Sequence, residues 1–254
     1  MDLGIKNKTY IVCGATSGFG NAIAMQLLKE EANVIAVARN EEKLKMIQHS
    51  NVEILAGDIT RSSTMEELLK IASGRKVDGI LVNASGPPAK TFEETVMQDW
   101  DEAYRSLLRW KVELTKLFLP AFLENNYGRF VYIESSAVKQ PIDNLILSTS
   151  LRLSVVGFVK SLSQEVSGKG VTFNVLAPGY HFTPAVDRLI VKKAEKEKIS
   201  VNEARSSIEK GIPVGHAGRA EYFATLAVWL LSPMAEYVTG QVYAVDGGTI
   251  KSIL

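Results

Sequence analysis

Ser148 and Arg152 are the residues whose types and spacing most directly suggest chemistry in this sequence. They lie four residues apart in a helix-prone stretch, so they would share one helix face. An arginine there can hydrogen-bond sugar hydroxyls and offer positive charge to a developing oxyanion, but it stays protonated and cannot supply a proton. A serine hydroxyl is a poor acid without a neighbouring base, so we expect it to orient a substrate oxygen or to relay a proton from water.

The elements that must position this pair follow an alternating pattern. Apolar runs rich in β-branched residues predict seven strands, at 9–13, 33–38, 52–57, 78–83, 129–134, 171–177 and 241–247. Helical patterns lie between them, at 20–31, 63–73, about 97–126, about 143–167 and 221–232. Runs that are apolar on both faces are typical of parallel strands covered by helices. The sequence therefore predicts one α/β domain over residues 1–254, a Rossmann-type doubly wound parallel sheet of about seven strands with helices on both faces.

One segment, at about 183–211, departs from this alternation. It contains no strand-like run, and its sequence VKKAEKEKISVNEARSSIEK (191–210) is polar and helix-prone. Such a charged stretch indicates a solvated helix pair on the surface. A long insertion at a sheet edge is equally typical of a lid over a binding site. The sequence leaves both interpretations open.

Composition excludes several classes of function. The 254 residues are 46% apolar and carry a formal net charge of +1, which gives no general attraction for nucleic acid or acidic membranes. The only cysteine, Cys13, lies in an apolar strand-like run, which favours a buried inert thiol. No apolar run approaches the roughly 20 residues of a membrane span, and no signal peptide is recognisable. We expect a soluble cytoplasmic protein without a metal site.

A glycine-rich turn, CGATSGFG, joins the first strand to the first helix. Gly14 would permit the tight turn, Gly18 would let backbone amides approach a phosphate, and Gly20 would let the helix pack close to the strand. The G-x-x-x-G-x-G spacing differs from the common dinucleotide fingerprint, but its position between strand and helix favours a dinucleotide pyrophosphate site. The remaining residues assigned to this turn are Thr16, Ser17 and Phe19.

The end of the second strand bears on the choice of cofactor. An acidic residue there commonly holds the ribose hydroxyls of NAD, but this chain has Val37 and Ala38, followed by Arg39. A guanidinium suits a 2′-phosphate through its charge and its fork of donors. We therefore expect NADP(H) to be preferred over NAD(H).

Several ordered motifs together resemble the short-chain dehydrogenase/reductase family, and in particular its 3-oxoacyl-[acyl-carrier-protein] reductase-like members. The resemblance covers nearly the whole chain. The motifs that carry it are CGATSGFG at 13–20, GDIT at 57–60, VNASG at 82–86, GRFVYIESS at 128–136, GFVKSLSQEV at 157–166, NVLAPG at 174–179 and VTGQVYAVDGG at 238–248.

The resemblance implies further cofactor contacts. Asp58, with Ile59 beside it, resembles the family's adenine-contacting aspartate motif. The residues that resemble the loop beneath the adenine ribose are Asn83, Ala84 and Gly86. The residues that match the segment flanking the nicotinamide are Pro178, Gly179 and Thr183. These residues largely shape the backbone, so a strand-end cap or a plain turn is compatible with the same roles.

The catalytic pattern of the family is only partly present. Ser135 matches the family's serine, whereas Leu107, Ser148 and Arg152 stand where the resemblance implies asparagine, tyrosine and lysine. The stretch 138–152 and the run from Gly86 to Pro88 resemble a divergent branch with serine and arginine at this spacing. Arg152 is therefore expected to serve both the cofactor ribose and catalysis, together with Ser148 and Ser135. Tyr180 is the alternative proton donor.

The sequence supports three functional hypotheses. The first is an NADP-dependent oxidoreductase that reduces a small-molecule carbonyl, 3-oxoacyl-like or another ketone, with atypical proton delivery. The second is a redox sensor that binds the nucleotide without turnover, and the third is a non-catalytic subunit of a mixed oligomer. We expect the first.

We also expect a homo-oligomer, either a tetramer or a dimer. For that assembly, two interpretations of Leu108, Trp110 and Leu114 remain open: they either form an exposed apolar stripe or fill the core.

Overall fold

A single seven-stranded parallel sheet forms the centre of the protein in a computed structural model that describes residues 1–166 and 168–253. The strand order is β3-β2-β1-β4-β5-β6-β9, and every neighbouring pair is parallel. The strands are β1 (Thr9–Cys13), β2 (Asn33–Ala38), β3 (Val52–Ala56), β4 (Val77–Val82), β5 (Gly128–Ile133), β6 (Val171–Pro178) and β9 (Val242–Val245). The predicted Rossmann-type sheet is confirmed. Two residues lie outside the described part of the chain, 167 and 254. Residue 167 is the last residue of the helix predicted at about 143–167.

The strand order creates a topological switch point at the carboxyl edge of the sheet. From β1 the chain moves outward through β2 to β3, then returns so that β4 lies on the other side of β1. Loops after β1 and β4 therefore diverge to opposite sides of the sheet, and such a switch point is where open α/β sheets bind ligands. The predicted glycine turn follows β1, and the predicted VNASG motif ends β4.

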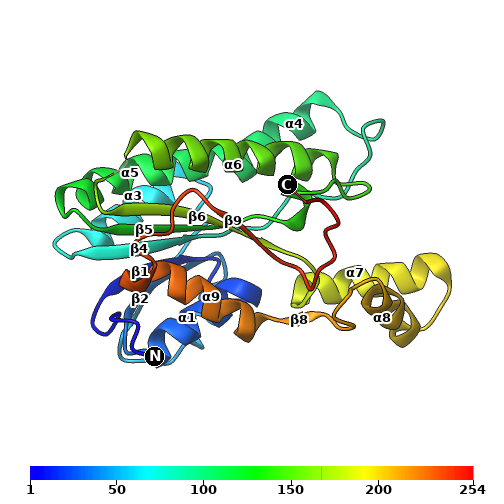
Figure 1. Cartoon of the computed structure of the whole chain (residues 1–254), viewed down its shortest axis with the longest axis horizontal. Helices are drawn as coiled ribbons and strands as arrows, with labels where there is room; N and C mark the ends of the chain where they lie inside the picture. Colours follow the sequence, from blue (N-terminus) through cyan, green and yellow to red (C-terminus); the bar gives the residue numbers. More distant parts are fainter. Residues whose placement is uncertain (167, 254) are drawn as a thin grey trace.

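Helices cover both faces of the sheet (Figure 1). One layer contains α3 (Ser62–Ala72), α5 (Trp110–Glu124) and α6 (Ile146–Glu165), and the other contains α1 (Gly18–Lys29) and α9 (Ala220–Leu231). The short α2 (Glu41–Lys45) was not predicted, because five residues are too few to show a helical period. The remaining short elements are η2 (Ser136–Val138), β7 (His181–Phe182), β8 (Gly218–Arg219) and η3 (Pro233–Ala235).

The helix predicted at about 97–126 is continuous but not uniform. It consists of α4 (Met97–Ala103), the π-helical turn η1 (Tyr104–Arg109) and α5. Such π turns often occur at functional sites, and this one contains the buried Leu107. The interpretation of Trp110 and Leu114 as an exposed stripe is wrong, because both lie in the core with at most 1% of their surface exposed, and Leu108 packs against the same core.

By length and composition, α6 could cross a membrane: it has 20 residues and a mean hydropathy of 1.2. Among the described residues it is the one helix that meets this test. A core helix of a soluble protein meets the same test, so a single such helix is weak evidence for a span. In this structure α6 packs on β6 and contains the buried Arg152.

The segment at about 183–211 forms a helical hairpin that projects beyond the carboxyl end of β6 (Figure 1). Its helices are α7 (Pro184–Glu197) and α8 (Val201–Lys210). Ser200 and Glu203 form a capping box at the start of α8. The hairpin has a small core of its own, built on Ile190, Ala194 and Ala204. The predicted helix pair is therefore present, and its core is separate from that of the sheet.

Close packing of α1 on the end of β1 depends on Gly20. A Cβ atom at this position would lie 2.2 Å from the Gly14 carbonyl oxygen. We predict that Gly20→Ala lowers the free energy of unfolding by about 1–3 kcal/mol, the range for overpacking, although alanine normally favours a helix. Urea denaturation measures this loss. Met25→Ala, at an exposed position of the same helix, is the control and should change stability by less than about 0.5 kcal/mol. A gain in stability for Gly20→Ala would contradict the packing argument.

Candidate active site

The glycine turn leaves the first turn of α1 open to an anion. Gly14 and Gly18 have positive φ angles of 72° and 54°, which side-chain-bearing residues rarely adopt. Ser17 precedes α1 but forms no side-chain cap, and the first helical turn carries no acidic residue. The Asn21 side-chain amide donates to the Ala15 carbonyl at 3.1 Å, which stabilises the glycine turn. Backbone N–H groups and the helix dipole therefore favour negative charge here, with Thr16 and Ser17 at its rim.

The side chain of Phe19 points into the core. Its ring lies 4.2 Å from the Phe223 ring and 5.1 Å from the His181 ring, measured between centroids. Burial lowers the pKa of His181, whose Nδ1 lies 3.1 Å from the Gly179 carbonyl oxygen. Phe19 is partly buried, so its ring packs mainly on these residues of the core, and His181 packs the loop.

The residues predicted to border the adenosine part of the cofactor differ in how exposed their side chains are. Arg39 is exposed at the end of β2, and its side chain pairs with no described residue. Asp58 accepts from the backbone N–H of Thr60 at 3.0 Å and from its hydroxyl at 2.8 Å, which shapes the turn after β3. Ile59 is buried in the core, so its side chain is not available to a ligand. An unpaired guanidinium at this position retains its full capacity for an anion.

The loop after β4 connects the glycine turn to the Ser148–Arg152 pair. The Asn83 amide donates to the Cys13 carbonyl at 3.3 Å, and a Cβ on Gly14 would lie 2.8 Å from the Asn83 Nδ2. Ala84 packs on the core. At the other end of the loop, a Cβ on Gly86 would lie 2.9 Å from a terminal nitrogen of Arg152. The missing side chain at Gly86 therefore makes room for the guanidinium.

The segment predicted to flank the nicotinamide follows β6 and approaches the glycine turn. Pro178 ends β6, and the Gly179 N–H donates to the Val245 carbonyl at 2.9 Å. Thr183 is buried, accepts from the Val186 N–H at 3.4 Å and so begins α7. Its side chain also lies 3.6 Å from where a Cβ of Gly18 would be. The hairpin of α7 and α8 therefore begins against the glycine turn.

Ser148 and Arg152 lie on one face of α6, as their spacing predicts. The Arg152 Nε donates to the Ser148 Oγ at 3.0 Å, and an Arg152 terminal nitrogen donates to the Glu134 carboxylate at 2.9 Å. The other Glu134 oxygen accepts from the Lys111 ammonium on α5. One carboxylate at the end of β5 thus joins two cations from two different helices.

This group of charges is deeply buried. Lys111, Glu134 and Arg152 are 1%, 4% and 8% exposed. Burial lowers the pKa of Lys111 to about 8, because desolvation outweighs the attraction of Glu134, and the charge of Arg152 acts in the same direction as burial. Within the described residues, no acceptor takes the Ser148 hydroxyl proton, so that proton is free to point at a ligand.

Ser135 and Tyr180 are not joined to this group by a described contact. The Ser135 Oγ accepts from the Ala137 N–H at 3.2 Å, which caps η2. Tyr180 borders a hollow of about 300 Å³ whose lining includes neither Ser148 nor Arg152. His216 and Tyr222 border the same hollow. Of the four predicted catalytic residues, the structure therefore brings together Ser148 and Arg152.

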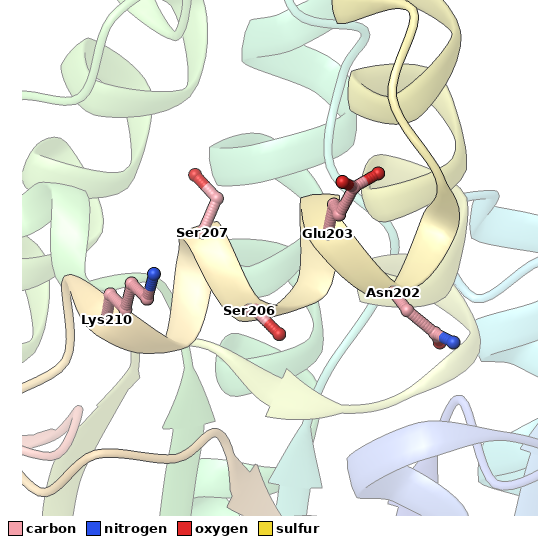
Figure 2. A pocket seen from close by; sticks show the side chains of 5 residues that line it. All are labelled: Asn202, Glu203, Ser206, Ser207 and Lys210. Atoms are coloured by element: carbon pink, nitrogen blue, oxygen red, sulfur yellow. The ribbon is translucent and has the colours of Figure 1, made fainter.

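A second hollow, of about 400 Å³, is lined entirely from α8, by Asn202, Glu203, Ser206, Ser207 and Lys210. Figure 2 shows Glu203 and Ser207 on one side of the helix and Asn202 and Ser206 on the other. The Glu203 carboxylate is already occupied by the capping box with Ser200. The side chains do not converge on one point, so this polar face is a surface of the hairpin and not a centre for acid–base chemistry.

Sequence reasoning missed Glu134 and Lys111. A signal was present for each: Glu134 ends an apolar strand beside Ser135, and Lys111 interrupts an apolar helix four residues after Leu107. A charged residue in such a position needs a buried partner. The partner itself could not be read, because the contact joins residues that are far apart in sequence.

The fold and the glycine turn at the switch point define a Rossmann-type α/β protein, and comparisons with known proteins define its family. The family described as enoyl-(acyl carrier protein) reductase matches residues 14–249. The chain therefore belongs to this family of short-chain dehydrogenases/reductases, which makes it a short-chain oxidoreductase. The expected family resemblance is confirmed, while the divergent Ser/Arg branch remains a prediction.

Individual relatives match over nearly their whole length. The NADPH-dependent reductase BacG of Bacillus subtilis is 26% identical, with 98% of this chain and 100% of the relative covered. The 3-oxoacyl-[acyl-carrier-protein] reductase FabG of Rickettsia felis is 29% identical, with 97% and 98% covered. Among solved structures, an actinorhodin polyketide ketoreductase variant with NADPH is 28% identical with a TM-score of 0.89, and 96% and 97% of the two chains are covered.

The buried charges predict a pH-dependent effect on stability. Glu134→Gln leaves two buried cations without a counter-ion and should cost about 3–5 kcal/mol near pH 7. The loss should be smaller near pH 9, because without Glu134 the pKa of Lys111 falls further and the variant's native state releases that proton first. Urea denaturation at the two pH values measures both losses. Glu124→Gln, an exposed control on α5, should change stability by less than about 0.5 kcal/mol. A loss for Glu134→Gln that is as small as the control's would contradict this account.

Proposed function

We propose that the protein reduces a small-molecule carbonyl, 3-oxoacyl-like or another ketone, by hydride transfer from NADPH, with a proton that does not come from a tyrosine. The observation that carries this proposal is the loop after β4, which contacts the glycine turn through Asn83 and the guanidinium of Arg152 through Gly86. The same loop thus contacts both the glycine turn, which would bind phosphates, and the guanidinium that would face the reacting oxygen. NADPH is named for BacG and for the polyketide ketoreductase structure, which supports the cofactor, and the names of FabG and the ketoreductase support reduction of a ketone.

The residues present fit the cofactor. The open first turn of α1 and the glycine turn would hold the pyrophosphate, and the unpaired Arg39 would hold a 2′-phosphate. Asp58 and Asn83 would border the adenosine, and Pro178 and Gly179 the nicotinamide. When bound, NADPH supplies the hydride.

The chemistry assigned to this chain's own residues is limited to binding, orientation and charge. Arg152 would bind ribose hydroxyls and stabilise negative charge on the substrate oxygen, but its guanidinium cannot donate a proton. The free hydroxyl proton of Ser148 would orient that oxygen or pass on a proton from water. Ser135 would assist in orienting the substrate. Tyr180 is the remaining candidate donor, although it borders a hollow that neither Ser148 nor Arg152 lines.

The α7–α8 hairpin is assigned the role of a lid within one domain. Thr183, at the base of the hairpin, lies against Gly18 of the glycine turn, so an occupied turn and the position of the hairpin would influence each other. The separate core of the hairpin would let it move as a unit. A homo-oligomer remains a prediction, and no contact with nucleic acid or membrane is proposed.

Cofactor preference has a direct test at Arg39. We predict that Arg39→Ala weakens NADPH binding about tenfold or more, because a charged hydrogen bond to the 2′-phosphate is lost, while NADH binding stays unchanged. Fluorescence titration of both nucleotides measures this difference. Arg109→Ala, an exposed arginine on η1, is the control and should bind NADPH as the wild type does. Tighter binding of NADH than of NADPH by the wild type would refute the cofactor assignment.

The reaction is tested with a panel of ketones, 3-oxoacyl thioesters, enones and imines, with NADPH oxidation as the readout. We predict turnover of a carbonyl compound, and Ser148→Ala should lower kcat about tenfold or more with NADPH affinity nearly unchanged. Ser150→Ala, exposed on the same helix, should behave as the wild type. Full activity in Ser148→Ala would move the proton source elsewhere, and Tyr180→Phe would then be examined. Tight NADPH binding without any turnover would favour the redox sensor or the non-catalytic subunit.

A further inference from the structure

Two buried ions, Lys111 and Glu134, lie behind the Ser148–Arg152 pair. The Glu134 side chain is fully buried and that of Lys111 nearly so, so neither can touch a bound ligand directly. Buried ion pairs are costly, and apolar residues of similar volume often give equal or better stability. Stability therefore does not explain why two ions occupy this place.

Glu134 determines how Arg152 is oriented. Its backbone N–H donates to the Leu176 carbonyl at 2.8 Å, which fixes the residue at the end of β5 beside β6. The carboxylate then accepts from one terminal nitrogen of Arg152, while the Nε of Arg152 donates to Ser148. A guanidinium is planar and rigid, so two such contacts fix its plane. The second terminal nitrogen consequently points at the loop containing Gly86.

Lys111 determines the net charge of the group. The charged side chains that face its ammonium are Glu134 at the end of β5 and Arg152 on α6. Tyr132 on β5 is occupied by a hydrogen bond with Thr115. The other charged side chains on the described elements packed against α5 are Asp78 at the far end of β4 beside Thr9, Arg129 at the start of β5, where it donates to the carbonyls of Ser232 and Gly170, and the exposed Glu66, Glu67 and Lys70 on α3 and Arg105 and Arg109 on η1. Lys111 is thus the member of this group that titrates near neutral pH.

We propose that Glu134 and Lys111 are positioning residues of this site: Glu134 fixes the Arg152 guanidinium against Ser148, and the protonation state of Lys111 sets the positive potential that Arg152 presents to a bound anion. This inference rests on the proposed function, in that the anions are NADPH and the developing substrate oxyanion.

The direction of the pH effect follows from the charges. With Lys111 protonated, the group of Lys111, Glu134 and Arg152 carries a net charge of +1. Above the pKa of Lys111, at about 8, the group is neutral, because Glu134 then balances Arg152 alone. Both NADPH affinity and turnover should therefore fall as pH rises through that value.

The experiment measures the dissociation constant of NADPH by fluorescence from about pH 6 to about pH 10. The wild-type constant should rise roughly fivefold across the transition, as expected for losing one nearby charge. Lys111→Met should bind weakly with no transition, because it mimics the neutral form. Lys111→Arg should bind tightly over the whole range. Lys116→Met, an exposed lysine on the same helix, should reproduce the wild-type profile.

The outcomes separate this inference from the proposed function, since binding and turnover are recorded at the same pH values. A binding transition that Lys111→Met abolishes supports the inference even if no carbonyl is turned over, in which case only the proposed function falls. A transition that persists unchanged in Lys111→Met overturns the inference, whatever the turnover. A wild-type profile that is flat around pH 8, or that shows no NADPH binding at all, also overturns it. If the bulkier arginine prevents folding, Lys111→Met decides, because a flexible methionine suits the buried site.

Discussion

The site depends on one carboxylate, that of Glu134, which is held between two cations from different helices. A buried charge needs a partner of opposite sign, and here that requirement ties the end of β5 to both α5 and α6. The same contact orients Arg152 toward Ser148 and toward the loop after β4. Arg152 thus forms part of a larger charged group, whose other members, Glu134 and Lys111, lie on neighbouring elements.

The glycines explain how the loop after β4 can contact both this group and the glycine turn. Gly20 brings α1 onto the end of β1, and Gly86 leaves space for the guanidinium. Between them, the Asn83 side chain spans from β4 to the carbonyl of Cys13. The contacts of this loop and of α1 therefore depend on glycines, which have no side chain to block them, as well as on the Asn83 and Arg152 side chains.

The sequence predicted the sheet well, because parallel strands covered on both faces are continuous apolar runs, and it predicted the shared face of Ser148 and Arg152 from helical spacing alone. It did not predict α2, which is too short to show a period, and it left open whether Trp110 and Leu114 are buried, because an apolar stripe does not reveal which surface covers it. Glu134 and Lys111 were missed for a related reason. Their contact joins two elements whose relative rotation is set by packing, and no local pattern records that rotation.

The separate core of the α7–α8 hairpin has a consequence for how such a protein can diverge. Ile190, Ala194 and Ala204 pack among themselves, so substitutions elsewhere on the hairpin leave the packing of the sheet untouched. Mutations on the outer turns of α7 and α8 can therefore accumulate without threatening the folding of the whole chain. Such a scaffold tolerates residue changes on the hairpin best, which lets selection vary that surface while the sheet and the glycine turn are inherited unchanged.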